Sequence, residues 1–133
     1  VQAAIGLGQI ERVEELVARK RSIFAAYARL LVGNNKIALN PEPPGTINGF
    51  WMPTVVFDKA SGVTREILQA EFARANIDAR VFFWPLSGLP MFQPMRDNLN
   101  SWDIPGRAIN LPSFHDMTEE QIGRVAEIVN RFR

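Results

Sequence analysis

The chain has 133 residues, 15 basic and 14 acidic side chains, a formal net charge of +1, one histidine and no cysteine. This length suits one domain, and the lack of cysteine excludes disulfides and thiolate metal sites. The near-neutral charge argues against a nucleic-acid partner, which needs an excess of clustered Lys and Arg. No run approaches the ~18 unbroken apolar residues of a membrane span, so we expect a globular, cytoplasmic protein with no membrane partner.

Residues 1–33 are predicted to form one long helix. Apolar residues recur at spacings of three, four and seven from Ile5 to Leu31, and Gly33 with Asn34 is a natural stop. A helix of ~30 residues is ~45 Å long, whereas a compact chain of this size is roughly 36 Å across. The uncharged first two turns should therefore extend beyond the domain and pack on a partner outside this chain. A frayed start is the alternative.

The rest of the chain, residues 34–133, is predicted to alternate strands and helices. A proline-rich linker at 40–45 is followed by strands at 49–58, 79–84 and 106–111, helices from Thr64 to about Ala75 and from Thr118 onward, and an irregular segment at 86–104. Thr118 and Gln121 match a capping box. This order predicts a two-layer α/β (α+β) sandwich, with helices on one face of a small mixed or antiparallel sheet.

A search for catalytic groups assigns none within the chain. His115 is the only histidine, and no nucleophile stands near it in a strand-to-helix elbow. One histidine and no cysteine do not favour a metal site. The three lysines are expected on a solvated helix face (Lys20), in a loop (Lys36) and in a turn (Lys59), where nothing would lower their pKa for imine chemistry.

A set of eight aromatic residues lies in and between the predicted strands: Phe50, Trp51, Phe82, Phe83, Trp84, Phe92, Trp102 and Phe114. They could form a stacking surface for a ring or a sugar, although about half of them should be core. Strand alternation would place Phe82 and Trp84 on one face and Phe83 on the other. Arg80, Ser87 and Asn98 are the polar groups best placed to reach a ligand.

Three ordered segments resemble motifs of the DegT/DnrJ/EryC1/StrS family of sugar aminotransferases. They read Q-A-A-I-G-L-G-Q-I-E-R at residues 2–12, R-V-F-F-W-P-L-S-G-L-P-M-F at 80–92, and N-L-P-S with M-T-E-E-Q-I at 110–113 and 117–122. The resemblance covers essentially the whole chain. Within the family, the pattern is most similar to the perosamine synthases, which aminate a keto group on a nucleotide-linked deoxysugar.

The resemblance implies the C-terminal small domain of a fold-type-I enzyme that depends on pyridoxal 5'-phosphate. Residues 1–33 would be the interdomain helix and residues 34–133 the small domain. The Schiff-base lysine and most cofactor ligands would lie in a large domain outside this chain, and the enzyme would be a homodimer. The implied substrates are glutamate, as amino donor, and a nucleotide-linked keto-deoxysugar used in polysaccharide or O-antigen synthesis. The chain alone would be inactive.

The same resemblance places Arg80, Phe83, Trp84 and Ser87 on the substrate side of the active-site cleft. The guanidinium fork of Arg80 suits two acceptors on a phosphate or sugar. The family often has histidine where Ser87 stands, so the role of this position is open. Two alternatives remain: a dehydratase of the same family, with histidine in place of the catalytic lysine, and an independent α/β binding module without a cofactor. The overlong first helix argues against the module.

Overall fold

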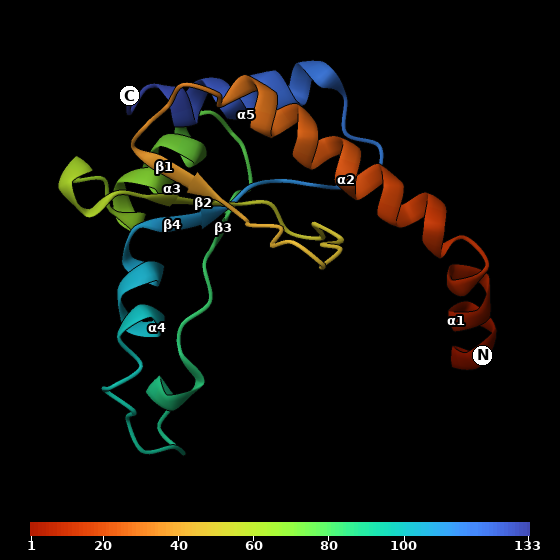
Figure 1. Cartoon of the computed structure of the whole chain (residues 1–133), viewed down its shortest axis with the longest axis horizontal. Helices are drawn as coiled ribbons and strands as arrows, with labels where there is room; N and C mark the ends of the chain where they lie inside the picture. The colour runs from red at the N-terminus through yellow and green to blue at the C-terminus, as the bar shows by residue number, and fades with distance from the viewer.

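The computed structural model describes residues 1–133 and shows a two-layer arrangement of helices over a four-stranded sheet (Figure 1). The helices are α1 (Gln2–Ile10), α2 (Val13–Leu30), α3 (Arg65–Arg74), α4 (Leu99–Asp103) and α5 (Glu119–Asn130), and the strands are β1 (Ile37–Leu39), β2 (Thr54–Phe57), β3 (Arg80–Val81) and β4 (Ala108–Asn110). The strand order is β1-β2-β4-β3, and every neighbouring pair is antiparallel. The predicted α/β sandwich is confirmed, in its antiparallel form.

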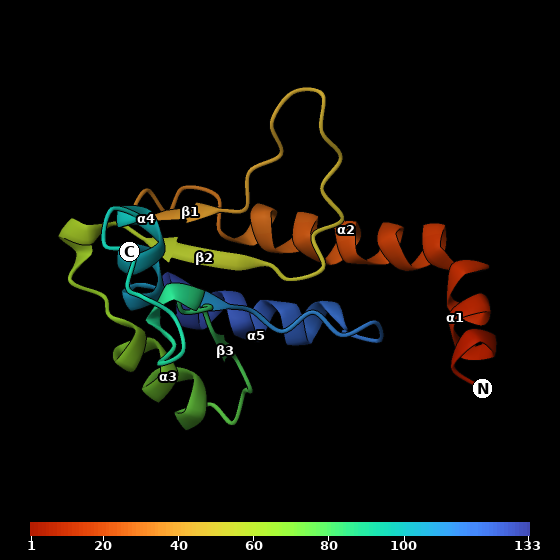
Figure 2. The same ribbon diagram turned by 90° about the horizontal axis from the view of Figure 1, so that it is seen from below.

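The long first helix is in fact two helices, so the prediction of one continuous helix is wrong at residues 11 and 12. Arg12 has φ −114° and ψ 8°, which is outside helical geometry, and α2 begins after it. No residue of α1 is buried, and α1 projects from the end of α2 away from the sheet (Figures 1 and 2). Because short helices depend on tertiary packing, nothing in this chain holds α1 in line with α2.

Each of the three predicted strands is shorter than expected, and the sheet contains one strand, β1, that was not predicted. β1 lies immediately before the expected linker and pairs with β2 through Ile37 opposite Phe57 and Leu39 opposite Val55. β3 ends at Val81, so the expected strand alternation of Phe82, Phe83 and Trp84 is wrong. The segment that follows leaves the sheet edge and forms, together with α4, a lobe below the sheet (Figure 1).

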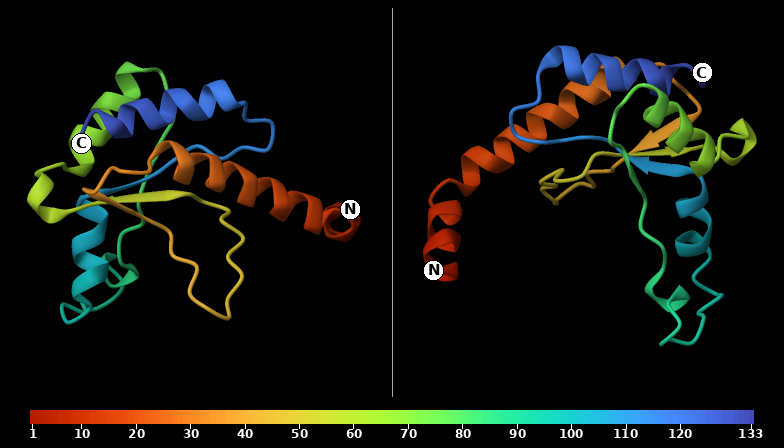
Figure 3. Two further views of the ribbon diagram at one scale, coloured as in Figure 1. Left: turned by 45° about the horizontal axis from the view of Figure 1, so that its top comes forward. Right: turned by 180° about the vertical axis from the view of Figure 1, so that it is seen from behind.

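The core lies between one face of the sheet and helices α2, α3 and α5 (Figure 3). Seventeen buried apolar residues form one cluster, including Ile23 and Tyr27 of α2, Val55 and Phe57 of β2, Leu68 and Phe72 of α3, Ile109 of β4, and Ile122, Val125 and Val129 of α5. The capping box that begins α5 is confirmed. The Gln121 amide donates to Thr118 Oγ1 at 3.2 Å, and the Thr118 amide donates to Gln121 Oε1 at 2.9 Å.

Two parts of the chain lie outside this core. The connection from β1 to β2 extends far from the sheet (Figure 2), with the Phe50 ring stacked on Phe24 at a centroid distance of 3.7 Å. The lobe after β3 exposes Phe83, Trp84 and Phe92 by 59%, 52% and 54%. Of the eight aromatic residues expected to divide evenly between core and surface, only Phe50 is buried, because most of the others fall on connections rather than strands. No helix combines the length and apolarity that crossing a bilayer requires.

Candidate active-site region

Two adjoining cavities lie beside the ends of β3 and β4. The first has a volume of about 370 Å³ and the second about 260 Å³. They share Asp78, which precedes β3, and the residues Pro112, Ser113 and Phe114, which follow β4. The two cavities therefore form one region, where the connections before β3 and after β4 meet residues of α2, α5 and the sheet.

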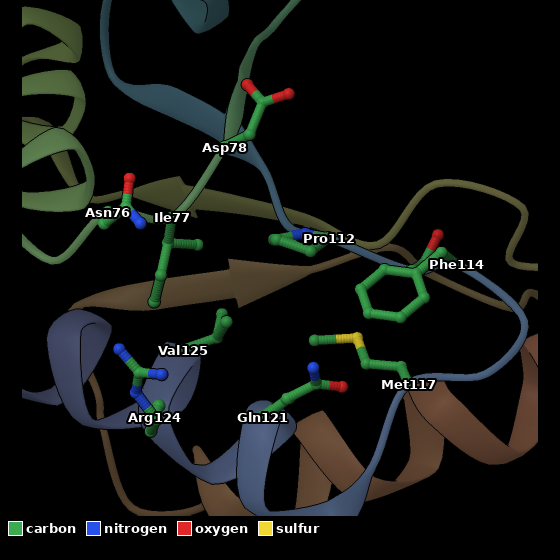
Figure 4. Close-up of a pocket in the computed structure, with 10 residues that line it drawn as sticks. Asn76, Ile77, Asp78, Pro112, Phe114, Met117, Gln121, Arg124 and Val125 are labelled. Carbon is green, nitrogen blue, oxygen red and sulfur yellow. The ribbon is translucent and has the colours of Figure 1, made fainter.

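The first cavity is mainly apolar. Figure 4 shows Ile77, Phe114 and Met117 facing its interior, with Gln121 and Arg124 of α5 on one side. Both polar side chains are already engaged, because Gln121 Oε1 accepts from the Thr118 amide and Arg124 Nη2 donates to the Ala75 carbonyl at 3.3 Å. This cavity can hold apolar surface, with the Gln121 amide and the Arg124 guanidinium at its side.

The second cavity is lined by three charged side chains. Lys20 of α2 and Asp78 and Arg80 from the start of β3 line it, together with Asn110 and Ser113. Arg80 Nη2 lies 2.8 Å from Asp78 Oδ2, and both side chains are about three-quarters exposed, at 76% and 73%. Exposed pairs of this kind contribute little to stability, so the Arg80 guanidinium remains available to a ligand.

Lys20 is the functional candidate that sequence reasoning missed. Its ammonium is partly buried and donates to the Ser113 carbonyl and, at 3.3 Å, to Ser113 Oγ. Burial lowers the pKa of Lys20, so the expected solvated position is wrong. The signal was present in the sequence, since Lys20 lies three residues before Ile23 and seven before Tyr27, on the helix face that packs on the core.

Helix α2 also fixes the rest of the connection that borders both cavities. Arg19 Nε donates to the His115 carbonyl at 2.8 Å, and its Nη2 donates to the Met117 carbonyl. The Tyr27 hydroxyl donates to the Pro112 carbonyl at 2.8 Å. Together with Lys20, which donates to the Ser113 carbonyl, these two side chains hold residues 112–117 against α2.

A buried polar row sets the register of the sheet beside the second cavity. Thr54 Oγ1 donates to Asn110 Oδ1 at 2.8 Å, and Asn110 Nδ2 donates to the Val81 carbonyl at 3.1 Å. Asn110 lies opposite Arg80 in the β3–β4 pair. The row therefore ties three strands together where Arg80 enters the cavity.

The structure separates the four residues that the resemblance grouped as substrate-binding. Arg80 lines the second cavity, whereas Phe83, Trp84 and Ser87 line neither cavity. The Trp84 ring lies 4.5 Å from the Arg65 guanidinium carbon, and Ser87 Oγ is buried without a hydrogen-bond partner. No three His, Cys, Asp or Glu side chains gather as a metal-ligating set. The substrate role of these four residues stays a prediction.

Known proteins match this chain over nearly all of its residues. Residues 1–130 match the model of the DegT/DnrJ/EryC1/StrS aminotransferase family. The GDP-perosamine synthase of Vibrio cholerae is 29% identical over 135 residues, which cover 98% of this chain and 36% of that protein. The GDP-perosamine synthase of Escherichia coli O157:H7 is 30% identical over 131 residues, covering 98% of this chain and 35% of its own length.

Solved structures of aminotransferases share the fold. The aminotransferase TlmJ from Streptoalloteichus hindustanus superposes with a TM-score of 0.84 at 19% identity, over 98% of this chain and 35% of that structure. The sugar aminotransferase Spr1654 from Streptococcus pneumoniae, in its PMP form, gives a TM-score of 0.83 at 20% identity over 98% and 34%. The chain thus spans about a third of the length of these relatives. Because the family match extends over nearly all its residues, the chain belongs to the DegT/DnrJ/EryC1/StrS aminotransferase family.

Proposed function

We propose that this chain is the C-terminal small domain of a sugar aminotransferase that depends on pyridoxal 5'-phosphate. The enzyme would transfer an amino group from glutamate to a nucleotide-linked keto-deoxysugar, as a cytoplasmic homodimer that supplies a polysaccharide sugar. Residues 1–33 would connect to a large domain, and residues 34–133 would form the small domain. The observation that carries this proposal is the family match over residues 1–130, and the similarity to two GDP-perosamine synthases supports it.

The lysines of this chain do not fit the anchoring role for pyridoxal phosphate, which forms an imine with a lysine. The Lys20 ammonium is bonded to the Ser113 carbonyl, and Lys59 Nζ pairs with Asp103 Oδ1 at 3.1 Å. Lys36 is exposed beside β1, away from the two cavities. When bound, the cofactor supplies an aldehyde that accepts and then releases an amino group. We therefore assign its binding mainly to the rest of the enzyme.

The proposed contribution of this chain is to bind and orient the sugar substrate. Arg80 would donate to two phosphate or sugar oxygens, because its fork can engage two acceptors at once. Phe83 and Trp84 are more than half exposed and would offer ring faces to the sugar, while Ser87 lies on the same segment. The apolar first cavity would help to keep water from the reacting groups.

The test is an amino-transfer assay on the protein at its natural length. Glutamate should convert the bound cofactor from its aldehyde to its amine, and a nucleotide-linked keto-deoxysugar should convert it back with formation of an aminosugar. Arg80→Met should raise KM for the nucleotide sugar about tenfold, as expected for a lost charged hydrogen bond, and leave the glutamate half-reaction unchanged. Arg74→Met, at an arginine that is 75% exposed on α3, is the matched control.

Other outcomes would reject this proposal in distinct ways. Loss of a sugar hydroxyl without amino transfer would indicate the dehydratase, and the absence of any cofactor-dependent reaction would indicate the binding module. Equal KM values for Arg80→Met and Arg74→Met would remove Arg80 from the substrate site but leave the aminotransferase assignment in place.

A further inference from the structure

The second cavity contains a cation without a counter-ion. Lys20 takes part in none of the ion pairs of the structure, and its ammonium donates hydrogen bonds only to Ser113. A partly buried ammonium costs free energy unless it is paired and hydrogen-bonded. We propose that the second cavity is an oxyanion-binding site in which the Lys20 ammonium is the principal cation.

The other groups that line the cavity suit an oxyanion. Arg80 supplies a second cation, and its only ionic partner, Asp78, is 73% exposed and competes weakly for it. The Asn110 side chain has little access to a ligand, because the residue is 2% exposed and one of its two amide N–H groups donates to the Val81 carbonyl. The Ser113 hydroxyl likewise donates to the Trp51 carbonyl at 3.0 Å. Charge recognition in the cavity therefore falls to Lys20 and Arg80.

Hydrogen bonds from α2 hold the Lys20 side of the cavity in place. The Ser113 carbonyl fixes the Lys20 ammonium, and Tyr27 and Arg19 hold the connection on either side of Ser113. Its volume of about 260 Å³ lies below the ~300 to 1,000 Å³ typical of complete drug-sized ligands. It therefore suits one charged group of a larger substrate.

The oxyanion-site proposal rests on the proposed function, which offers two sources of the oxyanion. One is a phosphate of the nucleotide-linked sugar, and the other is a carboxylate of glutamate. An ammonium and a guanidinium bind both groups through charge-assisted hydrogen bonds. The shared chemistry is thus an anionic group with several acceptor oxygens, and the test must separate the sources.

Calorimetric titration of the protein at its natural length provides that separation. The probes are inorganic pyrophosphate and a nucleoside diphosphate in one arm, and glutamate and succinate in the other. Lys20→Gln keeps a donor for the Ser113 carbonyl but removes the charge, whereas Lys20→Arg keeps the charge. Lys36→Gln, at an exposed lysine outside this cavity, is the matched control. Thermal unfolding of each variant reports whether it is folded.

We expect Lys20→Gln to weaken binding in one arm about tenfold or more, as the loss of a charge-assisted bond predicts. Lys20→Arg and Lys36→Gln should stay within about twofold of the unaltered protein, since the charge at the cavity is kept in both. The arm that responds identifies the source of the oxyanion.

Two results would overturn the oxyanion site. The first is equal binding by folded Lys20→Gln and Lys36→Gln, which would make Lys20 a purely structural tie to Ser113. The second is no binding of any probe by the unaltered protein. The site and the proposed function can fail separately. Lys20-dependent binding without amino transfer would retain the site and reject the aminotransferase, whereas amino transfer with unaltered binding by Lys20→Gln would do the reverse.

Discussion

Raising the pH above about 10 should lower the free energy of unfolding of the chain through Tyr27, its only tyrosine. Tyr27 is fully buried, and burial raises the pKa of its hydroxyl above the ordinary value near 10. The folded state favours the neutral hydroxyl, so this stabilisation is complete below pH ~10 and is lost as the pH rises toward the raised folded-state pKa. Each pH unit in that window lowers the free energy of unfolding by about 1.4 kcal/mol, and at about pH 11 the loss from Tyr27 is therefore about 1.4 kcal/mol.

Urea unfolding of the 133-residue chain between about pH 8 and about pH 11, followed by tryptophan fluorescence, measures this loss. Tyr27→Phe is the control, because it removes the ionisable group and should abolish the Tyr27 part of the decrease. At neutral pH the same change should cost about 1 kcal/mol, since it deletes the hydrogen bond to the Pro112 carbonyl. Phenolate absorbance that rises near pH 10 while the chain is still folded would refute the reasoning.

Three further changes test the fold. Thr118→Ala should lower the free energy of unfolding by about 1 kcal/mol in urea titrations, because it deletes the capping box; an effect equal to that of Thr118→Ser would contradict the cap. Leu68→Ala should cost about 2 to 5 kcal/mol in the same assay, whereas Leu86→Ala, at a side chain 73% exposed, should stay within about 0.5 kcal/mol; similar losses would mean that the core is misplaced. Deleting residues 1–10 should leave the urea midpoint unchanged, because no residue of α1 is buried; a lower midpoint would show that α1 supports the core.

Features that depend on local signals could be predicted from the sequence. Thr64 caps the N-terminus of α3 and Thr118 that of α5, and each side chain accepts from a backbone amide three residues later. Such caps need only a few neighbouring residues. β1 was missed for the opposite reason. Its three residues are too few to show a period, and they become a strand only by pairing with Val55–Phe57 of β2.

The candidate site was predictable only in part, because its contacts are distant in sequence. Arg80 was found through the strand and motif that contain it. Lys20 was misread, since a lysine among charged neighbours on a helix is usually solvated, and its partner Ser113 is 93 residues away. Its position on the same helix face as Ile23 and Tyr27 was visible, but the carbonyl that receives its ammonium was not. Periodicity can thus indicate which face a charge occupies, and only the tertiary fold shows what it meets there.

Helix α2 connects α1 to the part of the chain that contains the two cavities. Its side chains hold the Pro112, Ser113 and His115 carbonyls beside the cavities, and its first residue follows the turn that leads from α1. The cavity side of α2 is fixed by the core, whereas α1 is joined to it only through that two-residue turn. The direction of α1 is therefore not set by the core. A partner that binds α1 would fix its own position relative to Lys20 only by also contacting α2 or the sheet.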